Sequence, residues 1–492
     1  MQLSKSEYMM FLKHPAWLWL KKHDKNKLPK PDENLQAIFD AGIEFEKYAN
    51  KRFSDGVYIS FNGYDEYLSM PKRTKQALDN NAKTIFQARF EANNITCICD
   101  IIDRVDKNTF DLYEIKSSTK VKPEHYPDLA FQTIALESAG LKVRNIAVIH
   151  VNNQYIRDGE IDPISLSTVT DITHGVRNKI EETKNNIKLA FNIIKLSELP
   201  DPSPRHVSLG PLSDWLKIYK SLGDKIDIYS IYNLIAPGVK RIGELEDLGV
   251  TLIKDIPDDF RLTSKQQIQV MATKKNERII NKEKIKDFLN TLTYPLYFLD
   301  YETAMSFAPL YDGSRPYQQI PFQYSLHVIE KANKEPEHTE YLHRDNSHPV
   351  SNLLNKLKQD IGDVGSVLVW YRTFETKRNE EMAQMFPKFS KFLGDVNNRM
   401  IDLMKPFGSG WFADKDFLGR ASIKDVLPVV VPNLSYKDLD IQEGSSAQRL
   451  WMDTVIRKKG NTDQEKLFSD LVKYCKMDTL AMVEIWKVLE SL

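Results

Sequence analysis

The sequence predicts a multidomain α/β protein. Its 492 residues exceed the usual size of a single hydrophobic core, and 41% of them are hydrophobic. Runs with the two-residue period of strands alternate with runs of helical period in both end regions of the chain. We therefore expect an α/β unit over residues 1–204, a helical connector over 205–289 and a second α/β unit over 290–492, with the first boundary at the proline-rich stretch DPSPRHVSLGP.

Composition argues against several classes of protein. The 68 basic residues balance 68 acidic residues, which argues against a tail-like binder of nucleic acid but leaves room for an enzyme with a local basic cleft. Three cysteines argue against a disulfide framework and fit a reducing compartment. Because no apolar run is long enough for a membrane span or signal peptide, we expect a cytoplasmic protein that does not bind membranes.

The first unit is predicted to combine helices and strands. Apolar residues of NLQAIFDAGIEFEKYANKRF recur at helical spacing, and ITCICDIIDRVD and TFDLYEIKSS are strand-like runs. HYPDLAFQTIALESAG predicts a second helix and NIAVIHVN a further strand. In residue numbers these are helix 34–53, strands 95–106 and 109–118, helix 125–140 and strand 145–152.

Two of these strands carry acidic residues and a lysine. Asp103 follows the apolar run of one strand, and Glu114 and Lys116 share a face of the next, because side chains alternate along a strand. Carboxylates that hold Mg²⁺ and a lysine that positions water suit metal-assisted cleavage of a phosphodiester. A cross-strand ion pair at the surface would use the same residues, and the spacing leaves both interpretations open.

The connector is predicted to be helical. GVKRIGELEDLGVTLIKDIP has two glycine-bounded helical turns, loosely like a helix-hairpin-helix clamp for a nucleic-acid backbone, although a packing connector explains them more simply. TKKNERIINKEKIKDF predicts a solvated helix face or a linker.

The second unit opens on a strand with two carboxylates, YPLYFLDYETA, residues 294–304. Asp300 and Glu302 share one face of this strand. Both faces begin apolar, which indicates a strand covered on both sides, and buried carboxylates are costly unless they are paired or hold a cation. A divalent metal with oxygen ligands would resolve the burial and the mutual repulsion. Alternatively, the two acids lie at a solvated strand end.

Two later segments carry further acids. In QEKLFSDLVKYCKMDTLAMVEIWKVL, Tyr474 and Asp478 lie within an apolar stripe of helical spacing. VGSVLVWYRTFETKRNEEMA predicts a strand, a turn and a helix that starts near Thr376, with Glu375 at the turn. Asp402 is a second candidate acid in this middle region. We expect the strand, the turn and the last helix to bring their carboxylates to one shared metal site.

The first unit resembles a known family of nucleases. Asp103, Glu114-x-Lys116 and Gln132 in a following helix are similar to the motifs of the PD-(D/E)xK nucleases of the RecB-like branch. Glu46 could take the place of the acid that the family carries in an early helix. The resemblance implies that Asp103 and Glu114 hold Mg²⁺ or Mn²⁺ and that Lys116, Glu46 and Gln132 complete the catalytic set.

Iron–sulfur members of this branch carry one cysteine near the start and three after the core. The opening LSKSEYMMFLKHPAWLWL looks like theirs, but His14 stands where the cysteine would, and SPRHVSLGPLSDWL contains no cysteine. Four thiolates hold such a cluster. We therefore expect no iron–sulfur cluster.

The second unit resembles the DEDD exonucleases of the RNase H-like fold, in the branch with a tyrosine in the last motif. Asp300-x-Glu302 matches their first motif and Tyr474-x-x-x-Asp478 their last, while Glu375 stands where the middle motif has Asp and the Asn of that motif is absent. The resemblance implies a site with two Mg²⁺ or Mn²⁺ ions held by these four carboxylates, with Tyr474 orienting the attacking water.

A polar loop follows the predicted metal strand. YDGSRPYQQIPFQYSLH offers Arg315, Gln318 and Gln319, which either bind a phosphate or a base of the substrate or fold onto their own domain. Together with YFLDYETA and VWYRTFE, this loop is similar to a family of uncharacterised bacterial proteins that join an exonuclease-like domain to a RecB-like nuclease domain.

These resemblances imply a metal-dependent nuclease, with 3′–5′ exonuclease chemistry in the second unit and a second nuclease site in the first. Its partner would be nucleic acid, with DNA favoured over RNA although the sequence does not separate the two polymers, in DNA repair or in defence against foreign DNA. The alternative is a nucleic-acid-binding or partner-binding protein in which one or both nuclease folds are inactive. The altered middle motif and the missing cluster cysteines favour this alternative.

Purified protein is expected to be colourless and to lack iron, because the four thiolate positions of a cluster are not filled. Elemental analysis and the visible absorption spectrum after anaerobic purification check this expectation. Stoichiometric iron together with a cluster absorption band would contradict it.

Overall fold

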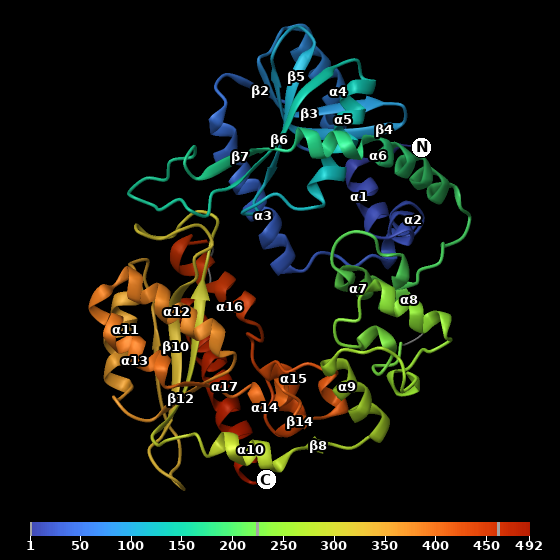
Figure 1. Ribbon diagram of the computed structural model, residues 1–492. Helices are drawn as coiled ribbons and strands as arrows, with labels where there is room; N and C mark the ends of the chain where they lie inside the picture. The colour runs from blue at the N-terminus through green and yellow to red at the C-terminus, as the bar shows by residue number, and fades with distance from the viewer. Residues whose placement is uncertain (1, 223–225, 460–462) are drawn as a thin grey trace. The chain divides into compact units, whose positions relative to one another are not determined.

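A computed structural model describes residues 2–222, 226–459 and 463–492 (Figure 1). The chain forms two compact units, each built around one main sheet. The first unit contains Met1–Ile226, Gly238–Gly243 and Phe307–Pro316, and the second contains Asp227–Pro237, Glu244–Ser306 and Tyr317–Leu492. This confirms the mixed α/β class with more than one domain. The stretch expected as a connector is divided between the two units.

The first unit holds a seven-stranded mixed sheet of order β2-β3-β4-β5-β6-β7, with β1 beside β4. Its strands are β1 (Leu3–Ser4), β2 (Gly56–Tyr58), β3 (Thr84–Ala92), β4 (Ile95–Arg104), β5 (Thr109–Lys116), β6 (Lys142–Val151) and β7 (Ser167–Asp171). Its α-helices are α1 (Lys5–Lys13), α2 (Pro15–His23), α3 (Glu33–Ala49), α4 (Tyr64–Asp79), α5 (His125–Ser138), α6 (Thr173–Lys195) and α7 (Leu212–Leu222). The predicted helices and strands of this unit are present as α3, β4, β5, α5 and β6.

Helix α1 is fixed at both its start and its flank. The Ser4 hydroxyl accepts a hydrogen bond from the backbone N–H of Glu7, whose carboxylate accepts one from the N–H of Ser4, and this reciprocal cap sets the first turn. Tyr8 then stacks on Phe131 of α5, with ring centroids 4.9 Å apart. Lys5, in the same first turn, is thereby held close to α5.

The second unit holds a five-stranded sheet of order β11-β10-β9-β12-β13. Strand β9 is antiparallel to β10 and parallel to β12, and β12 is parallel to β13. The strands of this sheet are β9 (Leu296–Ala304), β10 (Ile320–Ile329), β11 (Glu337–Leu342), β12 (Ser366–Val369) and β13 (Met400–Asp402), and β8 (Ile279–Ile280) pairs with β14 (Phe412–Ala413).

The α-helices in this part of the chain include three that shape the site: α12 (Arg372–Met385), α15 (Ile423–Val430) and α17 (Gln464–Glu490). The others are α9 (Ser264–Lys275), α10 (Lys282–Leu289), α11 (Val350–Asp360), α13 (Ser390–Asn398), α14 (Lys405–Gly408) and α16 (Gly444–Trp451), while α8 (Val239–Asp247) spans a boundary between the two units.

Strand β9 is covered on both faces, as its sequence predicts. On one face Phe298 lies 5.9 Å from Trp486 of α17, measured between ring centroids. On the other face the Tyr301 hydroxyl donates a hydrogen bond to Asn379 of α12 at 3.0 Å. Asp300 and Glu302 therefore lie on the face that α17 covers, because alternate residues of a strand share a face.

The region around His14 and Ser203 is packed with aromatic rings. The buried ring of His14 stacks on Trp215, with centroids 3.8 Å apart, and its Nε2 lies 2.9 Å from the Ser203 carbonyl oxygen. Ala16, Leu20 and Val207 complete this small apolar cluster.

Within residues 2–222, 226–459 and 463–492, no helix is long and apolar enough to cross a bilayer.

Candidate metal centre

Two carboxylates of β9 and one thiol of α17 meet beneath the last helix. Asp300, Glu302 and Cys475 each offer one ligand atom, and these atoms lie within 4.8 Å of one another. The Cys475 Sγ lies 3.9 Å from Asp300 Oδ2. Glu302 is buried, so the second half of β9 carries its charges into the interior of the unit.

Asp478 lies one turn beyond Tyr474 on the same face of α17, and both are buried. The Tyr436 hydroxyl donates a hydrogen bond to Asp478 Oδ1 at 2.6 Å. The Lys424 ammonium donates to the Tyr474 hydroxyl at 3.1 Å and to the Gln442 carbonyl at 2.6 Å. Lys424, on α15, thus brings a cation to the rim of the carboxylate cluster.

Glu375 lies in the first turn of α12 with its side chain buried, and its pKa responds to Asp300 and Glu302. Its Oε2 has no hydrogen-bond partner among the described residues. An unpartnered carboxylate oxygen at this depth is costly unless a cation or water meets it.

Asp402 positions this turn and does not join the cluster. Its carboxylate accepts hydrogen bonds from the backbone N–H groups of Tyr371 and Arg372, both at 3.2 Å, and from that of Met404 at 3.0 Å. Tyr371 adopts a left-handed conformation, with φ at 75°. These bonds stabilise that uncommon conformation and start α12 at Arg372, earlier than the sequence suggests.

The electrostatics of the cluster are dominated by burial. Burial and the neighbouring Asp478 carboxylate raise the pKa of Asp300 well above its usual value. Burial raises the pKa of Glu302 and of Glu375 in the same direction, and Asp300 adds to both. Burial raises the pKa of Asp478 to about 6, while the Tyr436 hydroxyl and Lys424 oppose the rise. One lysine therefore does not neutralise the four carboxylates.

The residues present fit a divalent cation with oxygen ligands. Asp300, Glu302, Glu375 and Asp478 offer carboxylate oxygens, which Mg²⁺ and Mn²⁺ prefer. Burial and the adjacent carboxylates raise the pKa of the Cys475 thiol, so the thiol keeps its proton and lies beside the site as a neutral neighbour.

The predicted substrate loop is divided between the two units. Gln319 accepts a hydrogen bond from the Thr303 hydroxyl at 2.9 Å, next to Glu302 in sequence. Gln318 donates to the Met385 sulfur at 3.6 Å. Arg315 is exposed and belongs to the segment Phe307–Pro316, which clusters with the first unit.

A second cluster of charges lies in the first unit, between α1, β5 and α5. The Glu114 carboxylate accepts hydrogen bonds from Lys5 at 2.9 Å, from Lys116 at 2.6 Å and from Gln132 at 2.7 Å. Asp128 accepts from Lys116 and from Gln132, each at 3.0 Å. Three of the predicted residues, Glu114, Lys116 and Gln132, are thus brought together.

Lys5 and Lys116 compensate Glu114 and Asp128 in this second cluster, whereas the pKa values of the nearby Asp100 and Glu46 are raised. Burial alone would lower the pKa of Lys5 and of Lys116, but the carboxylates of Asp128 and Glu114 outweigh it and hold both values above the usual one. Burial and Asp128 would raise the pKa of Glu114, yet Lys116 and Lys5 reverse the shift and lower it. Lys5 and Lys116 therefore neutralise Glu114 and Asp128, as a bound metal ion would.

Asp103 lies outside this cluster. Its carboxylate accepts hydrogen bonds from Lys83 at 2.6 Å and from Thr84 at 2.7 Å. Asp100 of the same strand is the acid that faces Glu114: it accepts from the Ile115 N–H at 2.7 Å, and burial and Glu114 raise its pKa to about 7. Residues three apart in a strand lie on opposite faces, which explains why Asp103 points elsewhere.

Glu46 lies near the cluster on α3. It accepts a hydrogen bond from Gln87 at 2.5 Å, and burial raises its pKa, with Glu114 adding to the rise and Lys5 opposing it.

Sequence reasoning missed three residues of the cluster in the first unit: Lys5, Asp100 and Asp128. A signal existed for Asp100 and Asp128. Asp100 shares its face of β4 with the half-buried Ile98 and the buried Ile102 rather than with Asp103, and Asp128 precedes Gln132 by one helical turn. No local signal marks Lys5, which meets Glu114 across 109 positions of sequence.

Comparison with known proteins leaves the activity open. Residues 297–422 match the model of a family described as "Domain of unknown function (DUF2779)". The chain is 25% identical over 227 residues to "Uncharacterized protein MG366" of Mycoplasma genitalium, covering 42% of this chain and 34% of the relative. It is 26% identical over 221 residues to the homologue of that protein in Mycoplasma pneumoniae, covering 41% and 33%.

The alignments span about a third of the length of each curated relative. The DUF2779 match includes Asp300, Glu302 and Glu375 but ends before Tyr474 and Asp478.

The stability of metal-free protein is expected to report on Asp478. Because the pKa of Asp478 rises from 3.8 to about 6 on folding, the folded state keeps a proton that the unfolded state loses. The contribution of this carboxyl to stability is therefore full below about pH 4 and is lost as the pH rises through about 6. The amide introduced by Asp478→Asn cannot titrate and can still accept from Tyr436, so this substitution removes the dependence.

Urea denaturation in EDTA measures this effect. Between about pH 4 and pH 7, wild type should lose roughly 2–3 kcal/mol relative to Asp478→Asn. A difference between the two proteins that stays constant across this range would contradict the assignment.

Proposed function

We propose that the protein is a metal-dependent nuclease whose second unit hydrolyses phosphodiester bonds from a 3′ end. The observation that carries the proposal is the set of carboxylates from β9, the first turn of α12 and α17 whose pKa values burial raises, with Lys424 and Arg378 as the cations that oppose the rise. A fold that keeps these acids buried without metal bears a large desolvation cost, which divalent ions would remove.

Bound at Asp300, Glu302, Glu375 and Asp478, divalent ions would supply activation of water and stabilisation of the charge that develops on the phosphate. The chain itself would orient the reactants. Burial and the Asp478 carboxylate hold the pKa of Tyr474 well above its usual value, so Tyr474 remains a neutral hydroxyl. It would orient the attacking water by hydrogen bonding and would not abstract a proton from it.

Lys424 and Tyr436 support the same chemistry. The Lys424 ammonium donates to the Tyr474 hydroxyl, which leaves the tyrosine proton free to point elsewhere. The same cation lies where negative charge from a phosphate would be stabilised. Tyr436 holds Asp478 in one orientation through its 2.6 Å hydrogen bond.

For the first unit, a binding role is a second candidate function. Glu114 and Asp128 are already neutralised by Lys5 and Lys116, at N–O distances of 2.6–3.6 Å. A metal ion at Glu114 would have to displace at least one ammonium group. A nuclease site that needs metal and a nucleic-acid-binding unit without cleavage are therefore both compatible with these contacts.

The test of the proposed activity is a cleavage assay on end-labelled single- and double-stranded DNA and RNA, with Mg²⁺, Mn²⁺ or EDTA. We expect shortening from the 3′ end that depends on metal. Purified protein that leaves all four substrates intact with both metals would overturn the proposal.

Asp300→Asn is expected to abolish 3′-end trimming, with a fall in rate of several orders of magnitude, because metal positioning is lost. In calorimetry, wild type should gain melting temperature on addition of Mn²⁺, and Asp300→Asn should gain much less. Without metal the variant should be as stable as wild type or slightly more stable, because one of the repelling charges is gone.

Asp395→Asn is the matched control, since Asp395 is an exposed acid on α13 of the same unit. It should behave as wild type with and without Mn²⁺. Equal gains of melting temperature in wild type and Asp300→Asn would refute the shared metal site.

Lys116→Ala tests the first unit. Any cleavage that survives Asp300→Asn should disappear in the double variant, because Lys116 contacts Glu114 and Asp128 in a separate site. A second variant, Lys5→Ala, should lower the free energy of unfolding by roughly 3–5 kcal/mol, because the buried Glu114 carboxylate then loses one of its two ammonium partners. The exposed Lys120→Ala serves as control.

If Asp300→Asn alone removes all cleavage, the first unit does not cleave, and the binding role is retained for it. Filter binding of the same substrates to Asp300→Asn, with and without Lys116→Ala, then shows whether this unit holds nucleic acid.

A further inference from the structure

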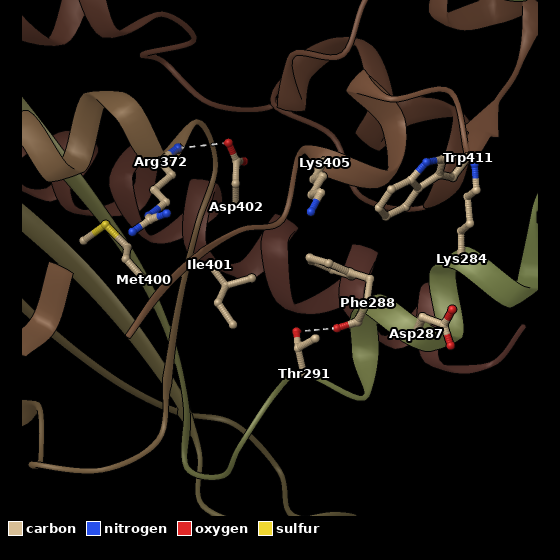
Figure 2. Close-up of a pocket in the computed structure, with 10 residues that line it drawn as sticks. All are labelled: Lys284, Asp287, Phe288, Thr291, Arg372, Met400, Ile401, Asp402, Lys405 and Trp411. Carbon is tan, nitrogen blue, oxygen red and sulfur yellow. Dashed lines mark hydrogen bonds between the residues drawn. The ribbon is translucent and has the colours of Figure 1, made fainter. Parts of the chain in front are cut away.

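A pocket outside the carboxylate cluster combines cations with aromatic rings. It lies along β13, the edge strand of the second unit's sheet, and encloses about 570 Å³. All three residues of β13 line it, together with the end of α10, the start of α12 and the segment around α14. Its polar and aromatic groups are Lys284, Asp287, Phe288, Arg372, Asp402, Lys405 and Trp411 (Figure 2).

The cations of this pocket are available to an anion. Within the described chain, none of Lys284, Arg372 and Lys405 has a carboxylate oxygen within 4.0 Å. The Asp402 carboxylate accepts from three backbone N–H groups and keeps its negative charge, so Asp402 and Asp287 together offset two of the three cations. Arg372 also donates to the Asn397 backbone carbonyl at 3.2 Å. Asp287 is exposed, and the balance of the lining is cationic.

The aromatic side of the pocket offers a surface for stacking. Phe288 and Trp411 lie edge to face, with centroids 6.3 Å apart. The Lys405 ammonium lies 5.5 Å from the Trp411 ring centroid. Figure 2 shows Arg372 and Trp411 on opposite sides of the cavity, with the Lys405 side chain between them.

We propose that this pocket binds one nucleotide unit, with its phosphate between Lys405 and Arg372 and its base against Trp411 and Phe288. The lining suits a ligand that carries a negative charge next to a planar aromatic ring, and stacking on an aromatic side chain tolerates any base. The pocket lies two strands from β9 in the sheet, apart from the four carboxylates. The class of ligand rests on the proposed function, because the nucleic acid that binds at the carboxylates would also bind in this pocket.

The test measures binding in EDTA, where no metal-dependent cleavage occurs. A fluorescent ten-nucleotide single-stranded DNA, a 5′-mononucleotide and inorganic phosphate are titrated into the full-length protein. Lys405→Ala should raise the dissociation constant at least tenfold and lower the slope of log affinity against log salt by about one. Trp411→Ala should weaken binding similarly, and Trp411→Phe should restore part of the loss.

Lys286→Ala is the matched control, because Lys286 is an exposed lysine of α10 that does not line the pocket. If mononucleotide binds one to one and Lys405→Ala weakens it, the pocket takes a free nucleotide. If only the DNA responds, the pocket holds a unit within a strand. Equal affinities of Lys405→Ala and Lys286→Ala, or binding of no ligand to wild type below millimolar concentration, would overturn the proposal.

Binding in EDTA and cleavage with metal are both measured on the pocket variants, which separates this inference from the proposed activity. If no cleavage is found, weaker binding by the pocket variants still supports this inference. If the pocket variants bind normally, metal-dependent cleavage still supports the proposed function.

Discussion

The cost of keeping carboxylates away from water governs the second unit. Asp300, Glu302 and Asp478 lie on the side of β9 that α17 covers, Glu375 on α12 interacts electrostatically with the first two, and burial raises the pKa of each of the four. An apolar strand needs apolar cover, and α17 supplies it through Trp486 against Phe298. The same helix then brings Asp478 to the acids that it covers. The packing that stabilises β9 therefore also buries its carboxylates at a cost in free energy, which a bound cation would offset.

The two units meet this cost in different ways. In the first, Lys5 and Lys116 bond directly to Glu114, so the carboxylate is neutralised by the chain itself. In the second, Lys424 bonds to the Tyr474 hydroxyl and to the Gln442 backbone carbonyl rather than to a carboxylate, and Glu375 Oε2 is left without a hydrogen-bond partner among the described residues. A charge-balanced cluster can be stable without a ligand, whereas an unbalanced one gains most from binding one. This contrast makes the second unit the stronger candidate for metal chemistry.

The spacing of residues along the sequence predicts those features of the site that depend on a single strand or helix. The strand parity of Asp300 and Glu302 and the helical spacing of Tyr474 and Asp478 are correct, because both follow from the repeat of a single element. The same parity, applied to β4, distinguishes Asp100 from Asp103, and the apolar run misled the prediction because it continues past Asp100. Lys5, Lys424 and Tyr436 come from distant segments, and only tertiary packing brings them to their sites.

The turn between β12 and α12 links the candidate metal centre with the nucleotide pocket. Asp402 accepts from the N–H groups that begin α12, Glu375 lies in the first turn of that helix, and Arg372 at its start lines the pocket. A change at Asp402, which also lines the pocket, would therefore disturb metal binding and pocket binding together. Lys405 on α14 and Asp300 on β9 belong to other elements than this shared support, which is why substitutions there can separate the two functions while the turn remains intact.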